Sequence, residues 1–104
     1  MTAKRAHLLL GAALIAGCAS AIPLPTDQDF ENGRRVYPDV TSEELRLGRE
    51  RYVAKCAGCH TLYVPSARLP AAWPKLVEQM AERAKLSAAD RQAIERYLVT
   101  IARR

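Results

Sequence analysis

Hydrophobic residues recur every three or four positions in three stretches of the second half of the chain, and this spacing predicts three amphipathic helices. The first stretch spans residues 41–56, the second spans 73–83, and the third begins at Ser87. Their apolar positions are Leu45, Gly48, Tyr52, Val53 and Cys56, then Trp73, Leu76, Val77 and Met80, and finally Ile94, Tyr97, Leu98 and Ile101. The pattern favours an all-α fold of about three helices.

Two of the predicted helices begin with a capping signal. Thr41 is followed three residues later by Glu44, and Ser87 is followed by Asp90 at the same spacing. In such pairs the hydroxyl and the carboxylate each accept a hydrogen bond from a free backbone N–H of the first turn. Gly48 lies in mid-helix, where glycine costs about 1 kcal/mol relative to alanine. We therefore expect the last helix to pass close to the first at Gly48.

Residues 18–40 show no sustained hydrophobic period. They combine polar, turn-forming residues with three prolines, which are Pro23, Pro25 and Pro38. Such a segment is expected to stay extended, so we divide the mature chain into a tether over 18–40 and a domain over 41–104. The alternative is a strap that packs around the domain. Its candidate anchors are Phe30, Val36 and Tyr37.

The first 17 residues have the order of a secretory signal, in which positive charge precedes an apolar run and then small residues. Lys4 and Arg5 come before an apolar run of nine residues over 8–16. This run is too short to span a bilayer, which requires about 20 residues. We expect residues 1–17 to be removed as a signal peptide.

The end of this leader, Leu14-Ile15-Ala16-Gly17-Cys18, resembles a bacterial lipobox. The resemblance implies that Cys18 becomes the first residue after cleavage and carries the lipid anchor, which accounts for a third cysteine in an exported chain. The next residue is Ala19 and not the aspartate associated with inner-membrane retention, which implies the periplasmic side of the outer membrane. The alternative is an ordinary secretory signal cut near Ala19 or Ala21.

The net charge is mildly basic. It is +5 for the whole chain, and removal of residues 1–17 takes away Lys4 and Arg5 and lowers it to +3. The sequence has no basic stripe with interleaved aromatic residues, so we expect no nucleic-acid binding. A basic surface of this size suits an acidic redox protein as partner.

The stretch Cys56-Ala57-Gly58-Cys59-His60 has the spacing of a c-type haem attachment motif. One helical turn presents both sulfurs to the vinyl groups of a porphyrin, and the next residue places its imidazole under the iron. This predicts one covalent haem c, with thioether bonds from Cys56 and Cys59 and with His60 as the proximal ligand. The alternatives are a thioredoxin-like redox pair, a zinc site and a small structural disulfide.

Met80 is the candidate for the sixth iron ligand. Once residues 1–17 are removed, Met1 and His7 are lost, and Met80 becomes the sole methionine while His60 is the sole histidine. The alternative is that Met80 only fills a gap in the core, as methionine commonly does.

From about residue 41 to residue 102 the chain resembles a small bacterial class I cytochrome c, through the haem motif, Gly48-x-x-x-Tyr52, Met80 and Tyr97-Leu98 in this order. The resemblance implies helices wrapped on one haem, with the first and last crossing at a glycine. It implies that His60 and Met80 bind the iron, and that Trp73 or Arg68 reaches a propionate. The chain departs from the family because Met80 follows His60 by only twenty positions and lies in a helical pattern.

These features predict a membrane-anchored periplasmic electron carrier and not an enzyme, because no general base or nucleophile arrangement is visible. One alternative is a haem domain that binds or senses a small ligand at an open sixth position. The other is a lipoprotein in which Cys56 and Cys59 are structural and no haem is bound.

Overall fold

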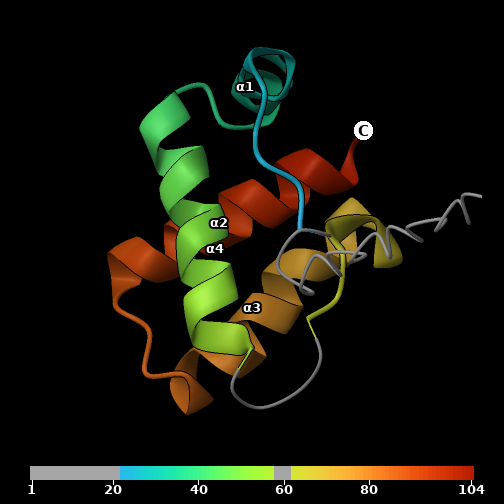
Figure 1. The fold of residues 1–104 in the computed structure, drawn as a ribbon. Coiled ribbons are helices and arrows are strands. Elements are labelled where there is room, and N and C mark those ends of the chain that lie inside the picture. The colour runs from blue at the N-terminus through green and yellow to red at the C-terminus, as the bar shows by residue number, and fades with distance from the viewer. Residues whose placement is uncertain (1–21, 58–61) are drawn as a thin grey trace, which may run out of the picture.

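The computed structural model describes residues 22–57 and 62–104, and over these ranges the chain is all-helical (Figure 1). The elements are α1 (Asp27–Val36), α2 (Ser42–Cys56), η2 (Pro65–Ala67), η3 (Pro70–Ala72), α3 (Trp73–Arg83) and α4 (Ala88–Ala102). The all-α prediction is confirmed. The three predicted helices are α2, α3 and α4, and α1 is an addition to them.

The helices α2 and α4 begin where the capping signals predict. The Thr41 hydroxyl accepts a hydrogen bond from the backbone N–H of Glu44 at 3.0 Å, and the Ser87 hydroxyl accepts one from Asp90 at 3.1 Å. Each bond satisfies one of the free N–H groups of a first helical turn. The Thr41 and Ser87 side chains therefore set the starts of the two longest helices, at Ser42 and Ala88.

The two long helices cross (Figure 1), and they come close at Gly48, as the sequence predicts. Gly48 is buried, and a Cβ added there would overlap the carbonyl oxygen of Ala93 and lie 2.7 Å from Cβ of Tyr97. Only a residue without a side chain permits this approach of the two backbones.

The described part of the predicted tether, from Ile22 to Val40, packs on the helices and contains α1. Ile22 and Val40 are only 2% and 3% exposed, so the segment packs as in the strap alternative, although Val36, one of its predicted anchors, is exposed. A full capping box between Thr26 and Asp29 starts α1. The hydrophobic pattern does not predict this helix, because its buried residues are Asp29 and Gly33 and not an apolar stripe. The extent of the tether and the domain boundaries otherwise stay predictions.

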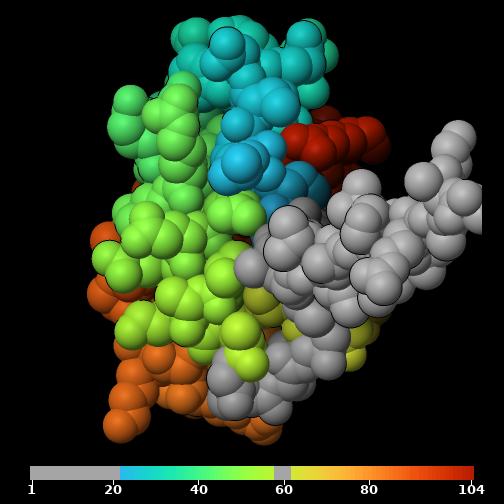
Figure 2. All heavy atoms as spheres, viewed as in Figure 1, coloured from blue at the N-terminus to red at the C-terminus, as the bar shows by residue number. Residues whose placement is uncertain are grey.

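Several polar contacts tie this N-terminal segment to the long helices and to the C-terminal residue Arg104. Arg49 of α2 donates through Nε to the carbonyl of Ile22 at 2.9 Å, and the Tyr97 hydroxyl of α4 donates to the carbonyl of Pro23. The Arg104 guanidinium donates to both carboxylate oxygens of the buried Asp29. Figure 2 shows residues 22–40 covering one end of the domain, beside the C-terminus.

The apolar core lies between α2, α3 and α4. Its buried members are Ile22, Tyr52, Cys56, Trp73, Val77, Ile94, Tyr97, Leu98, Val99 and Ile101. Most of these residues occupy the apolar positions that the three-and-four spacing predicts.

Within the described ranges, none of the helices combines the length and the apolar character needed to cross a membrane. The predicted signal peptide over 1–17 and the predicted lipid attachment residue Cys18 lie outside the residues that the structure describes.

Candidate functional site

Cys56, the first cysteine of the haem motif, is the last residue of α2. Its side chain is 6% exposed and belongs to the apolar core, together with Tyr52 one turn earlier and Trp73 of α3. The structure therefore places this sulfur where α2 ends, inside an apolar and aromatic surrounding. Cys59 and His60 lie outside the described residues, so their roles as thioether residue and proximal ligand stay predictions.

The segment that follows the haem motif is held by two buried aromatic side chains. The Tyr52 hydroxyl donates to the carbonyl of Tyr63 at 2.6 Å, and Nε1 of Trp73 donates to the carbonyl of Pro65 at 2.9 Å. The two rings pack edge to face, with centroids 6.3 Å apart. The main chain on the far side of the motif is thus fixed against α2 and α3 at two points.

Burial also sets the protonation state of Tyr52. Removal of the phenol from water raises the pKa of Tyr52 to about 12. The hydroxyl consequently keeps its proton at any pH at which the protein would work, and remains a donor to Tyr63.

The two candidates for propionate contact lie in different environments. Trp73 is 1% exposed, and the only N–H group of its side chain donates to the carbonyl of Pro65. Arg68 is exposed, and its guanidinium lies over the Tyr63 ring, 4.6 Å from the centroid, while it donates to the carbonyl of Ala67. Arg68 retains further N–H groups for an anionic partner, because a guanidinium has five. Both propionate assignments stay predictions.

Met80 lies within α3 and not in a loop. It is half-buried, and its carbonyl accepts the backbone N–H of Ala84 at 2.9 Å, so the helix is intact around it. It is seven positions after Trp73, which is about two helical turns, so both lie on the core side of α3. Any thioether ligand from Met80 would therefore extend from a rigid helix.

These residues fit the attachment of a haem. The group needs a sulfur at a fixed position and an apolar surrounding for the porphyrin, and Cys56 with Tyr52 and Trp73 supplies both. The half-buried Leu62 also packs against this cluster, just after the motif.

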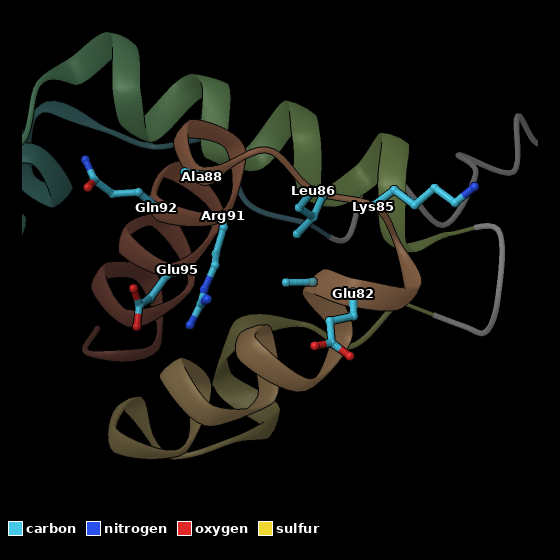
Figure 3. Close-up of a pocket in the computed structure, with 8 residues that line it drawn as sticks. Glu82, Lys85, Leu86, Ala88, Arg91, Gln92 and Glu95 are labelled. Atoms are coloured by element: carbon cyan, nitrogen blue, oxygen red, sulfur yellow. The ribbon is translucent and has the colours of Figure 1, made fainter.

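A separate groove lies between α3 and α4 (Figure 3). It has a volume of about 620 Å³. Its lining residues are Ala81, Glu82, Lys85, Leu86, Ala88, Arg91, Gln92 and Glu95. The charged lining side chains carry both signs, and none of the predicted haem residues lines the groove. We therefore do not assign the haem to it.

An all-helical fold in which a buried cysteine ends a long helix and opens a Cys-x-x-Cys-His motif defines a c-type cytochrome. Comparison with protein families agrees with this class, since the model of the dihaem cytochrome c family matches residues 52–104, about half of the chain. The chain belongs to the dihaem cytochrome c family. The searches of curated proteins and of solved structures gave no match.

The family match overturns the prediction of a single haem. A dihaem family points to two haems, so the assignment of one haem, and with it the monohaem class I resemblance, is wrong in this respect. The prediction counted attachment motifs, and the sequence contains one, at Cys56 to His60. A count of motifs therefore predicts one haem, whereas the family points to two. We assign no residue to the other haem.

Proposed function

We propose that this protein is a membrane-anchored periplasmic cytochrome that carries single electrons between redox protein partners, and that it has no enzymatic turnover. The observation that supports this most directly is the place of Cys56, buried at the end of α2 within the region that matches the family. An attached haem would be held by a rigid support with an apolar surrounding.

The bound haem iron supplies the one-electron chemistry, and the protein supplies position and dielectric. Cys56 and Cys59 would hold the group through thioethers, and His60 would hold the iron. Tyr52 and Trp73 keep the chain after the motif in one conformation, through carbonyls that cannot move without breaking a hydrogen bond. The apolar residues around Cys56 exclude water. Exclusion of water would lower the reorganisation energy when the haem gains or loses an electron.

Membrane attachment is the second part of the proposal. The lipobox resemblance at Cys18 supports diacylation of this residue, and more than one acyl chain gives stable anchoring. The protein would be attached on the periplasmic side. The outer membrane is favoured because Ala19 is not the aspartate associated with inner-membrane retention.

The experiment that tests the carrier function is an optical and EPR spectrum of the purified protein, combined with a redox titration. The full chain is produced in a host that attaches c-type haem, beside a Cys56→Ala/Cys59→Ala variant as control. We expect each haem to give a reversible one-electron transition. On a denaturing gel, we expect haem to stay with the chain of the natural protein and not with that of the variant. A colourless natural protein would contradict the proposal, and the pyridine haemochrome assay counts the haems per chain.

The second candidate, a ligand-binding haem domain, is kept because Met80 lies in an intact helix. A helix that could not bring the thioether to the iron would leave the sixth position open. Addition of carbon monoxide to the reduced protein separates the two functions. We expect little change in the spectrum if Met80 is bound, and a large change at once if the position is open.

A further inference from the structure

The chain enters the folded domain at Ile22, much earlier than an extended tether over 18–40 would allow. Ile22 is 2% exposed, and its carbonyl accepts from Arg49 Nε at 2.9 Å. The carbonyl of the next residue, Pro23, accepts from the Tyr97 hydroxyl. Residues 22 and 23 are therefore fixed to α2 and α4.

We propose that the domain lies directly against the lipid surface, with the face around Leu24 in contact with the bilayer interface. This inference rests on the lipid anchor at Cys18 in the proposed function. Three residues separate Cys18 from Ile22, and a fully extended chain spans at most about 3.6 Å per residue, or about 14 Å here. This span is shorter than α2, which measures about 22 Å at 1.5 Å per residue. The domain cannot stand clear of the membrane on so short a connection.

The surface next to this connection is apolar. Leu24 is 68% exposed, and Val64 is 36% exposed. Val64 lines a hollow of about 210 Å³, and Leu24 follows Pro23, which also lines it. The hollow is lined by Pro23, Val64, Pro65, Ser66, Ile101 and Arg104. We call Pro23, Leu24, Val64 and the hollow the anchor face; Figure 2 shows residues 22–26 at the surface, between α2 and the C-terminus.

We infer a lipid surface from the apolar residues of the anchor face and not from its charge. Arg104 borders the hollow, but its guanidinium is already paired with Asp29. An exposed leucine within a few residues of an acylated cysteine is held at the depth where lipid headgroups meet acyl chains, and burial of apolar area there adds to the anchoring.

The test uses the full, haem-loaded and lipidated chain in vesicles of phosphatidylethanolamine and phosphatidylglycerol. A nitroxide is attached at Leu24→Cys, and at Gln92→Cys as a matched control. Gln92 is exposed near the opposite end of α4, about 14 Å along the helix from Ile101. Relaxation by a water-soluble nickel chelate and by oxygen reports whether each label faces water or lipid. We expect the nickel effect at position 24 to be severalfold weaker than at position 92, and the oxygen effect to be stronger.

A second variant tests whether the short connection is the cause of the weak nickel effect at position 24. Insertion of a flexible glycine-serine segment of about 12 residues between Ala21 and Ile22 lengthens the connection without altering the domain, and should restore nickel access at position 24. Vesicle-bound protein with equal nickel access at both positions would overturn the inference alone. Protein that does not float with the vesicles would overturn the lipid anchor as well. Shielding of position 24 that persists in a soluble Cys18→Ser variant would assign the anchor face to a second copy of the chain and overturn contact with lipid.

Discussion

Tyr52 and Trp73 show how single side chains at this site act on the main chain. Both are almost fully buried, and each gives its one polar hydrogen to a carbonyl of the segment after the haem motif. Neither acceptor could be predicted from the sequence, because every residue has a main-chain carbonyl and the residue type does not indicate which one is used. The sequence does mark both residues as core positions of their helices, and the structure agrees.

Trp73→Phe is the residue-scale test of this support. The substitution keeps an aromatic ring in the core but removes the indole hydrogen bond to the carbonyl of Pro65, which costs about 0.5–1.5 kcal/mol because this carbonyl still accepts the backbone N–H of Arg68. We expect the free energy of unfolding in urea to fall by this amount, and the backbone amides of Ala67 and Arg68 to exchange faster with solvent. Lys75→Ala, at an exposed position of the same helix, is the control. Unchanged stability of Trp73→Phe would show that the hydrogen bond to Pro65 is not formed in solution.

At the scale of elements, the crossing of α2 and α4 determines where Cys56 lies. The close approach at Gly48 brings the two backbones together, and α2 then ends with its cysteine in the core. This crossing is predictable, since a glycine within a helical pattern indicates a close neighbour. The helix α1 could not be predicted in this way. Its buried residues are Asp29 and Gly33, and its few hydrophobic residues do not recur at helical spacing.

Gly48→Ala tests the crossing. The added Cβ would overlap a main-chain carbonyl of α4, which cannot turn aside as a flexible side chain does. We expect destabilisation by about 1–3 kcal/mol or more, as in overpacked cores, and a lower midpoint of thermal unfolding. Gly33→Ala is the matched control, because its nearest contact is the side-chain oxygen of Thr100 at 3.1 Å. Equal losses in the two variants would contradict the assignment of the tight contact to Gly48.

At the scale of the whole molecule, the two ends of the described chain are joined. Arg104 donates to the Asp29 carboxylate from the other end of the sequence, 75 positions away. This pairing closes α1 over the end of the domain. It lies beyond sequence reasoning, since nothing in the local pattern of Asp29 indicates which of many cations is its partner. The number of haems also lies beyond it, because the given sequence contains one attachment motif whereas the family is dihaem.

Acid should weaken this closure. The hydrogen bonds from Arg104 hold the pKa of Asp29 below its usual value, against the opposing effect of burial. A carboxyl with a lowered pKa in the folded state stabilises the fold above its unfolded pKa, and the stabilisation is lost as the pH falls through the folded pKa. We expect the free energy of unfolding in urea to decrease as the pH falls below about 4. The Asp29→Asn variant should show a smaller decrease. An identical pH dependence of the two proteins would exclude Asp29 as a contributor.

The contact of α2 with α4 at Gly48 leaves no space for either helix to slide past the other. The sulfur of Cys56 and the main chain at Pro23 are consequently two points on one stiff frame, joined through Tyr97. If the frame rests on a bilayer, the height of the porphyrin above the lipid is constant. The electron-tunnelling distance from the porphyrin to a redox partner would then depend on how that partner approaches, and not on internal motion of the cytochrome.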